Sequence, residues 1–317
     1  MDAAARREDA RVDETYESLR PLLFSIAYRM LGTVTEAEDV VQEALLRHHR
    51  AQAEGVEVES TKAYLSAVTT RLAIDHLRSA RVRRETYVGE WLPEPLVADA
   101  TAPDTARAAE QADSLSMAFL LVLERLSPVE RAVFLLRDVF DYGFDEVAAI
   151  VGKSEANCRQ LAVRARRHVD AERPRFEASR RKRDELAARF FAAVGDGDLH
   201  GLEELLAADV VVSGDAGGTS PSWPRPIVGR ERVARLLVGL ARVSRELELT
   251  LRPTIVNGQP GATVVDADGA LAYAVSLEIA DGVVQTVRAV RNPDKLRHLG
   301  HTADFRSLLR ERAERRR

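Results

Sequence analysis

The feature that most constrains the fold is the stretch of residues 126–169, which carries the start and stop signals of three consecutive helices. Ser127-Pro128-Val129-Glu130 predicts a helix start. The serine can cap the backbone, the proline stands where no N–H is needed, and the glutamate completes a capping box. Asp141-Tyr142-Gly143 is expected to interrupt this first helix, because such residues favour turns.

A second and a third helix follow the interruption. Residues 144–151 form a short apolar segment, and Gly152 supplies the residue type that most readily adopts a left-handed cap. Lys153 then turns the chain, and Ser154 can cap a helix that runs to about Val169. Two helices joined by a short turn that contains glycine form the helix-turn-helix pattern.

The third helix has two chemically distinct faces. At helical spacing, one face is apolar and is predicted to pack inward: Cys158, Leu161, Ala162, Ala165 and Val169. The opposite face carries amides and guanidiniums, which can read base edges or contact phosphates: Asn157, Arg159, Gln160, Arg164, Arg166 and Arg167. A solvated basic helix is the alternative, but turn, cap and donor stripe coincide and favour DNA contact. The first half of such a helix enters the groove, so the expected base readers are Glu155, Asn157, Arg159 and Gln160.

Composition sets looser limits. A chain of 317 residues suggests two or three domains, and a formal net charge of −4 does not by itself indicate a nucleic-acid partner. The charge is patchy, however, and the local field decides contact with phosphates. The single cysteine, Cys158, excludes an internal disulfide framework and a cysteine-rich metal site. No apolar run approaches a membrane span and the N-terminus is charged, so we expect a cytoplasmic protein that makes no contact with a membrane.

The first third of the chain reads as three helices. Residues 16–31 place apolar side chains on one stripe, and Gly32 ends that helix. Thr35-Glu36-Ala37-Glu38 predicts a capping box that opens a helix to about Arg50. Its outer face mixes both charge signs, which fits either a solvated surface or a protein partner, and periodicity cannot choose between them: Asp39, Gln42, Glu43, Leu46, Arg47 and Arg50.

A long helix is predicted over residues 61–84, and its second half is basic. The helix dipole accounts for two or three cations near a C-terminus. It does not account for all five arginines, so we expect nucleic-acid contact there: Arg71, Arg78, Arg81, Arg83 and Arg84.

Residues 86–112 read as a linker, with three prolines and a bias to alanine and acidic residues. Residues 87–95 are too apolar for a passive connection, and a tryptophan such as Trp91 is more often docked than floating. Beyond residue 183 the pattern changes to helices at 186–194, 199–206 and 230–243. Strands are expected at 210–213, 246–256, 262–267, 270–279 and 283–290. Asp281-Gly282 is a strong hairpin signal, and helices followed by antiparallel strands predict an α+β domain.

Separated motifs resemble bacterial extracytoplasmic-function sigma factors of the subgroup with a fused SnoaL-like domain. Residues 37–47, 72–79 and 126–169 are similar to regions 2 and 4 of that family. The motif Trp91-Leu92-Pro93-Glu94-Pro95 in the linker and Asn292-Pro293-Asp294-Lys295-Leu296 are similar to motifs of the subgroup. The subgroup pattern Asp-Gly-Gly-Gly is present as Asp215-Ala216-Gly217-Gly218, Tyr64 replaces a usual tryptophan, and Thr69-Thr70-Arg71 replaces Ala-Arg-Asn.

The resemblance implies a multidomain fold with two all-α domains and a C-terminal α+β cone. Region 2 is expected at 12–85, the linker at 86–112, region 4 at 113–172, the SnoaL-like domain at 184–300 and a charged tail at 301–317. The implied partners are core RNA polymerase, through its β′ clamp helices and its β subunit, and promoter DNA. The implied polymerase contacts are Asp39, Gln42, Glu43 and Arg47, and the implied −10 contacts are Asp75, His76, Arg78 and Arg81. The −35 contacts fall within residues 154–167, including Arg164 and Arg167, and the loop at 55–61 would hold an unstacked base.

The C-terminal domain is expected to regulate the sigma factor in cis, by clasping region 2 or the linker. Its expected contact residues come from three motifs: Trp91, Pro93, Pro95, Asp215, Gly217, Gly218, Asn292, Asp294 and Lys295. A catalytic cone would need a base such as Asp215, Asp266 or Glu278 with a donor such as Arg288 or Tyr273, but no tight acid–base constellation is visible. We therefore expect no catalytic residue, no cofactor and no metal, and a monomer when free. A one-component ligand-sensing regulator and a DNA-tethered isomerase or cyclase are the alternatives.

Overall fold

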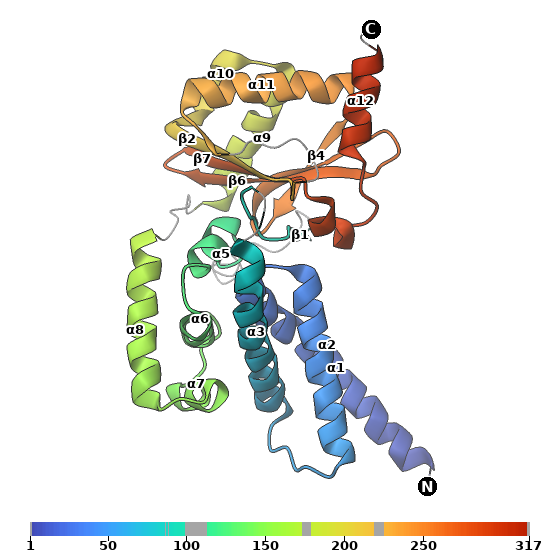
Figure 1. Cartoon of the computed structure of the whole chain (residues 1–317), viewed down its shortest axis with the longest axis vertical. Coiled ribbons are helices and arrows are strands. Elements are labelled where there is room, and N and C mark those ends of the chain that lie inside the picture. The colour runs from blue at the N-terminus through green and yellow to red at the C-terminus, as the bar shows by residue number, and fades with distance from the viewer. Residues whose placement is uncertain are drawn as a thin grey trace. The chain divides into compact units, whose positions relative to one another are not determined.

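The structure is a computed structural model of the whole chain (Figure 1), and it describes residues 2–85, 87, 89–98, 113–172, 179–218 and 225–315. The chain divides into two compact units. The first comprises Met1–Arg83 with Val122–Glu172, and the second comprises Arg84–Leu121 with Arg173–Arg317. Each unit is described by itself. Among the described residues, no helix has the length and apolar character that a membrane crossing requires.

The first unit begins with three helices, α1 (Asp2–Leu31), α2 (Val34–Ala53) and α3 (Thr61–Glu85). Gly32, at φ 73°, ends α1 as predicted. The predicted capping box at Thr35 and Glu38 is wrong by two residues: α2 starts at Val34 with Thr33 as N-cap, and the Thr33 hydroxyl donates to Glu36 Oε2 at 2.7 Å. Two overlapping Thr-x-x-Glu patterns occur here, and the tight end of α1 at Gly32 favours the first.

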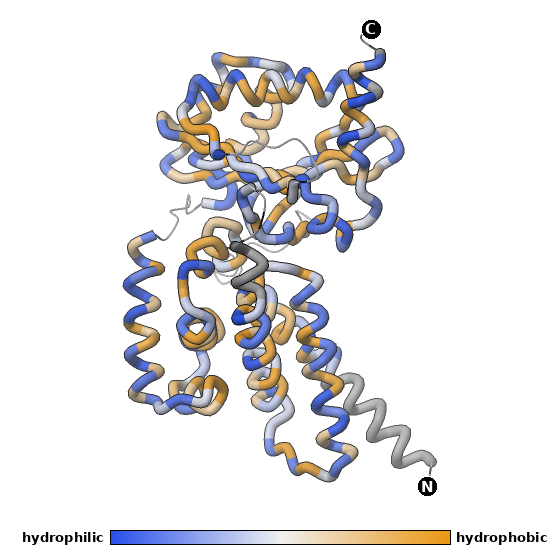
Figure 2. Tube along the Cα trace, viewed as in Figure 1, coloured by the Kyte–Doolittle hydropathy of each residue, from blue (hydrophilic) through white to orange (hydrophobic). Residues whose placement is uncertain are grey.

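The rest of the first unit is the predicted helix-turn-helix. It contains α6 (Pro128–Phe134), a π-helical turn η1 (Leu135–Val139), α7 (Phe144–Val151) and α8 (Glu155–Glu172). The capping box at Ser127 and Glu130 is present, and Gly152 adopts φ 66° at the end of α7. The inner face of α8 is buried, and hydrophilic and hydrophobic residues alternate along this helix (Figure 2). The π-helical turn just before the break at Asp141 has no sequence signal that we recognise.

The second unit is built on one mixed sheet. Along the sheet its strands run in the order β1 (Val97–Ala98), β4 (Thr250–Val256), β5 (Gln259–Val265), β6 (Leu271–Ala280), β7 (Val283–Val290), β2 (Leu206–Asp215) and β3 (Ile227–Val228). Three helices pack on one face, α9 (Arg180–Asp196), α10 (Leu199–Leu205) and α11 (Arg230–Glu246). They bury the alternate residues of β6, such as Val275, Leu277 and Ile279, as the period-2 pattern predicts.

The opposite face of the sheet is covered by part of the linker. Leu92 and Met117, at the start of α5 (Met117–Leu123), pack there with Val256, Ala274 and Val290. A second apolar core therefore lies beneath the sheet, and part of it comes from residues that precede the helix-turn-helix in sequence.

Several sequence-based assignments in this domain need correction. Strand β2 covers ten residues instead of four, and it pairs parallel to β7 although only antiparallel pairing was expected. Helix α11 continues to Glu246, so β4 begins at Thr250 instead of residue 246. The boundary errors arise because intrinsic propensity is a weak guide where helix and strand meet, so tertiary packing decides.

The predicted charged tail contains a helix, α12 (Phe305–Arg315), that contacts the rest of the domain. The Phe305 ring contacts that of Tyr273 edge-on, with centroids 6.5 Å apart, and Arg312 Nε donates to Glu246 Oε2 at 2.5 Å. An aromatic ring at the first position of this helix therefore docks it on the sheet domain.

Strand β5 contains a glycine that the packing requires. A Cβ added at Gly261 would lie 2.2 Å from the Val275 carbonyl oxygen and 2.8 Å from Val256 Cγ2. We expect Gly261→Ala to lower the free energy of unfolding by about 1–3 kcal/mol, because backbone atoms must move. Gly239→Ala is the matched control, since Gly239 in α11 has open space around it and should gain up to about 1 kcal/mol. Chemical denaturation of both variants measures the difference, and equal stabilities would contradict the close-approach argument.

Candidate nucleic-acid interface and linker-binding site

The predicted base-reading face of α8 is exposed to solvent along its whole length. Six of the seven predicted DNA contacts on this helix have exposed side chains, and the seventh, Arg166, is partly buried: Glu155, Asn157, Arg159, Gln160, Arg164 and Arg167 are the exposed ones. Ser154 caps the helix by accepting a hydrogen bond from the Asn157 N–H at 3.3 Å, as predicted. The Arg159 guanidinium is held in place, because it donates to Glu155 Oε2 at 2.7 Å and lies 5.2 Å from the centre of the Phe144 ring.

The inner face of α8 fixes how this stripe is presented. Cys158 is fully buried, and burial raises the pKa of its thiol, so it acts as a small core residue. Arg166 Nε donates to Asp138 Oδ1 at 2.7 Å, which ties α8 to η1. The exposed amides and arginines are thus carried by a rigid helix, but the bases that they would read stay a prediction.

The predicted −10 contacts on α3 are close together and partly paired with acids. Arg78 Nη1 donates to Asp75 Oδ1 at 3.0 Å, and His76 Nε2 lies 2.9 Å from Glu36 Oε1 on α2. The side chain of Arg81 lies outside the described residues. Asp75 and Arg78 are exposed, whereas His76 is half-buried between two helices.

The predicted polymerase-binding face of α2 is also open. Asp39, Gln42 and Arg47 are exposed, and Glu43 accepts a hydrogen bond from Arg47 Nε at 2.7 Å. Leu46, on the same face, is 45% exposed. An exposed leucine among charges of both signs fits a solvated surface as well as a protein interface, so this assignment also stays a prediction.

Within the first unit, α3 contacts the helix-turn-helix through polar groups. One of them, Arg71, was expected to contact nucleic acid, and here it donates to backbone carbonyls of α7. The hydroxyls of Ser66 and Tyr142 are hydrogen-bonded at 2.8 Å and both residues are buried. Arg71 Nη2 donates to the Ala149 carbonyl at 2.7 Å and Arg71 Nε to that of Ile150 at 2.8 Å, at the C-terminal end of α7, where carbonyls favour a cation.

A buried arginine also connects α1 with α6. Arg131 Nη1 donates to the Met30 carbonyl at 2.5 Å and to Glu124 Oε1 at 2.7 Å, and burial lowers the pKa of Arg131 to about 9. Serine, tyrosine and arginine at such spacings are common on any helix, so nothing in the sequence marked these pairs.

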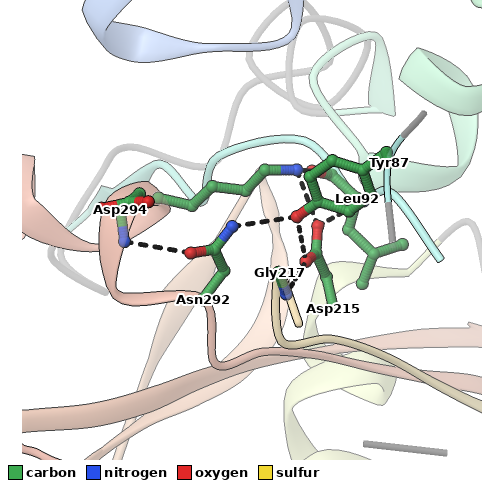
Figure 3. A network of polar contacts seen from close by, with 7 residues as sticks. Tyr87, Leu92, Asp215, Gly217, Asn292 and Asp294 are labelled. Atoms are coloured by element: carbon green, nitrogen blue, oxygen red, sulfur yellow. Dashed lines mark hydrogen bonds and ion pairs between the residues drawn. The ribbon is translucent and has the colours of Figure 1, made fainter. Parts of the chain in front are cut away.

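In the second unit, Asp215 at the end of β2 is the centre of a linker-binding site (Figure 3). Its side chain is fully buried. One carboxylate oxygen accepts from the Tyr87 hydroxyl at 2.5 Å, and the other accepts from the Leu92 N–H at 2.9 Å. Burial and the bond to Asp215 both raise the pKa of Tyr87, so its hydroxyl keeps the proton that it donates.

The motif that follows β7 supplies the positive charge of this site. Lys295 Nζ donates to Asp215 Oδ2 at 2.6 Å and to the Leu92 carbonyl at 2.5 Å. The same ammonium lies 4.3 Å from the centre of the Trp91 ring and 4.9 Å from that of Tyr87. The cation is therefore enclosed by one carboxylate, one carbonyl and two aromatic faces, all on the linker or on β2.

Asn292 and Gly217 complete the linker-binding site (Figure 3). Asn292 Nδ2 donates to the Tyr87 hydroxyl at 2.9 Å, and its Oδ1 accepts from the Asp294 N–H at 3.1 Å. Gly217 adopts φ 57°, and a Cβ there would lie 2.4 Å from Asn292 Nδ2. Both observations require glycine at this position, so the Ala216 departure leaves the essential residue of the loop unchanged.

The linker continues along the edge of the sheet. Strand β1 pairs with β4. Just before β1, the Asn257 backbone N–H donates to the Leu96 carbonyl at 2.8 Å, and the Leu96 N–H donates to Asn257 Oδ1 at 3.0 Å. Further on, Asp113 accepts from Arg183 Nη1 at 3.1 Å and from Gln259 Nε2 at 3.0 Å. Both ends of residues 87–113 are thus anchored on the C-terminal domain.

The structure brings together most of the linker and C-terminal residues that the sequence singled out. Trp91, Asp215, Gly217, Asn292 and Lys295 meet directly in the linker-binding site. Pro93 and Pro95 are buried, and the Pro95 carbonyl lies 2.8 Å from His298 Nε2. Gly218 and Asp294 lie at its margin, where Gly218 accepts from Arg306 and Asp294 is exposed. The anchors that were missed are Tyr87, Arg183, Asn257 and Gln259.

The helix-covered face of the sheet encloses a separate cavity of about 280 Å³, and its lining includes Tyr273. Asp215, Asp266, Glu278 and Arg288 are not among the described residues that line it. Glu278 pairs with Arg288, and burial lowers the pKa of Arg288 to about 10. Asp266 accepts backbone hydrogen bonds in a turn. Across the described part of the chain, no cluster of three metal-ligating side chains occurs.

Comparison with known proteins gives matches over most of the chain. The Sigma-70 region 2 family matches residues 15–83, the Sigma-70 region 4 family matches residues 116–169, and the SnoaL-like domain family matches residues 187–293. The ECF RNA polymerase sigma factor SigJ of Mycobacterium tuberculosis is 39% identical over 288 residues, which cover 88% of this chain and 91% of that protein. The probable ECF RNA polymerase sigma factor SigI of the same organism is 31% identical over 287 residues, covering 90% and 94%. The crystal structure of SigJ matches with a TM-score of 0.71 at 37% identity, covering 90% of this chain and 98% of that one.

Proposed function

Because this chain belongs to the extracytoplasmic-function RNA polymerase sigma factors with a C-terminal SnoaL-like domain, we propose that its linker-binding site regulates transcription initiation in cis. The chain acts as a sigma factor: it recruits core RNA polymerase to promoters in the cytoplasm. The observation that carries the regulatory proposal is the buried Asp215 carboxylate, which holds Tyr87, Leu92 and Lys295 at once. A linker anchored in this way limits how far the two DNA-reading modules that it joins can separate.

The exposed faces receive the following roles. The face of α2 with Asp39, Gln42, Glu43 and Arg47 binds the β′ clamp helices, and region 4 faces the β subunit. Asp75, His76, Arg78 and Arg81 on α3 contact the −10 element, and the face of α8 with Asn157 and Gln160 reads the −35 element. The assignment is supported by the side chains of this set that are exposed on helices: Asp39, Gln42, Arg47, Asp75, Arg78, Asn157 and Gln160.

The direct experiment adds the full chain to sigma-free core polymerase and maps transcription start sites. New start sites that share a common upstream sequence are expected. Their absence, together with no binding to core, would contradict the assignment. The alternative of a one-component regulator makes the opposite prediction, because it would bind duplex DNA tightly without polymerase.

A substitution in α8 tests the −35 assignment. Gln160→Ala should lower transcription from the cognate promoter by about 5–150-fold and relax base preference at one −35 position, since a bidentate base contact contributes about 1–3 kcal/mol. Arg181→Ala is the matched control, because Arg181 on α9 is exposed and pairs with Glu185 of the same helix. Unchanged base preference in Gln160→Ala would remove this residue from the set of readers.

We propose further that the SnoaL-like domain is not catalytic and that the free chain is a monomer. The absence of Asp215, Asp266 and Glu278 from the described cavity lining supports the first point, because a base must reach the substrate. Sedimentation of the free chain tests the second point. A concentration-dependent shift to twice the mass would overturn it.

A further inference from the structure

The cavity between the sheet and helices α9 and α11 is larger than packing defects usually are. Its volume is about 280 Å³, whereas protein interiors contain few voids that exceed one water molecule. A cavity of about 150 Å³ already accommodates benzene. Most of its lining is apolar and comes from both layers, as in Phe190, Leu237, Leu240, Val264 and Val287. Such a space suits an apolar molecule better than it suits ordered water.

The polar groups of the lining are cationic or hydroxylic. Arg245 and Arg291 line the cavity with Ser244 and Tyr273, whose hydroxyls lie 3.3 Å apart. No aspartate or glutamate is among the described lining residues. Arg291 is only 9% exposed, and burial lowers its pKa, which reflects the cost of removing this cation from water. An anion beside it would offset that cost, whereas a second cation would add to it.

Helix α12 closes this side of the domain. Phe305 at its start lines the cavity, meets Tyr273 edge-on, and lies under the Arg291 guanidinium at 5.6 Å. The bond from Arg312 to Glu246 holds the helix against the end of α11. Arg306 of α12 also donates to the Gly218 carbonyl at 3.1 Å. A helix attached by one aromatic ring and a few surface polar contacts can swing aside more easily than a strand of the sheet, so it provides a route of entry.

Arg291 also connects the cavity with the linker-binding site. Its backbone N–H donates to the Asp215 carbonyl at 2.7 Å, and the N–H of Asn292 reaches the same oxygen at 3.1 Å. The carboxylate of that same Asp215 holds Leu92 and Lys295. Arg291 therefore lines the cavity with its side chain and is hydrogen-bonded through its backbone to Asp215, which holds the linker.

From this arrangement we propose that the cavity binds a small apolar carboxylic acid, about the size of a medium-chain fatty acid, with its carboxylate at Arg291, and that its occupancy tightens the hold on the linker. Binding at the cavity does not depend on the proposed regulatory function, but the effect on the linker deepens that function. A ligand that binds the state with Arg291 in place stabilises the Arg291–Asp215 bond by mass action.

The test uses the full chain with decanoate, decan-1-ol and decylamine as probes, measured by titration calorimetry. We expect one decanoate per chain with a micromolar Kd, and decylamine at least tenfold weaker. Arg291→Met should weaken decanoate at least tenfold while it leaves decan-1-ol within threefold. Arg232→Met is the control, because Arg232 is exposed on α11 and does not line the cavity. Non-saturable decanoate binding, or equal binding of the cation, would overturn the site.

A second measurement separates the two halves of the proposal. Hydrogen exchange at the Leu92 and Leu96 amides reports the linker directly, since both donate to side chains of the C-terminal domain. At ten times its Kd, decanoate should slow this exchange by up to about tenfold. Saturable binding with unchanged exchange would overturn the coupling and leave the site intact. If decanoate does not bind, the cavity proposal fails, whereas the linker-binding site is still tested by its own substitutions.

Discussion

Replacing Asp215 with alanine is expected to release the linker from the C-terminal domain. The substitution removes the carboxylate beside the buried Lys295 ammonium and leaves the Leu92 N–H and the Tyr87 hydroxyl without that acceptor. Breaking a buried ion pair in this way costs about 3–5 kcal/mol, because the remaining charge stays uncompensated in a region of low dielectric.

The chain can avoid part of this cost by opening locally. If residues 87–95 detach, Lys295 regains water, so release of the linker should precede unfolding of the sheet. We therefore expect Asp215→Ala to expose the linker to limited proteolysis and to accelerate exchange at Leu92, with a smaller change in the global melting temperature. Mass spectrometry of the cleavage products locates the cut.

Asp294→Ala is the matched control for this substitution. Asp294 belongs to the same motif as Lys295, but its side chain is 62% exposed and pairs with Arg297 on the surface. Surface pairs of this kind contribute about 0–1 kcal/mol, so proteolysis should stay at the wild-type rate. Equal protection of the linker in Asp215→Ala and the wild type would show that other contacts hold it.

Local sequence signals determined much of the helical part of this fold. The Ser127 box, the glycine at 152 and the polar stripe of α8 each act within a few residues, so they can be read without tertiary information. The start of α2 shows the limit of such signals. Two overlapping Thr-x-x-Glu patterns compete there, and only the tight end of α1 selects Thr33.

Long-range pairing could not be predicted in the same way. The parallel alignment of β2 with β7 joins residues about 75 positions apart, and no local pattern encodes the direction of that pairing. The linker-binding site could be predicted only in part. The motifs at Trp91, Asp215 and Lys295 indicated a contact between the linker and the C-terminal domain, but they did not indicate that the contact centres on the Asp215 carboxylate. Tyr87, Asn257 and Gln259 were not predicted as anchors, because single polar residues in loops and at strand ends are ordinary.

The second large effect is expected from the contact between α3 and the helix-turn-helix. The −10 and −35 elements lie about 25 base pairs apart, which is roughly 85 Å of B-DNA at 3.4 Å per base pair. If α3 and α8 read these two elements as proposed, a unit in which the Ser66 and Tyr142 hydroxyls are 2.8 Å apart cannot reach both, so we expect this contact to break when the promoter is bound.

Tyr142→Phe should shift the first unit toward an open state. The substitution leaves the Ser66 hydroxyl fully buried without the Tyr142 partner in the closed state, whereas water satisfies it in the open state. A buried group that loses its partner costs about 1–3 kcal/mol, so the open population should rise by about 5–150-fold. Spin labels at positions 53 and 170, in a Cys158→Ala background, measure the change by electron–electron distance distributions.

The double substitution Ser66→Ala with Tyr142→Phe makes this prediction specific. Removing both hydroxyls leaves no unsatisfied group, so the double variant should return toward the wild-type distance. Tyr64→Phe is the control. It removes a hydroxyl from α3, the helix that also carries Ser66, at a position where the ring contacts His48, and it should leave the spin-label distance unchanged. If only the open state binds core polymerase, affinity must rise with the open population, highest in Tyr142→Phe and lower again in the double variant. A double variant as open as Tyr142→Phe would mean that the tyrosine acts through packing and not through its hydrogen bond.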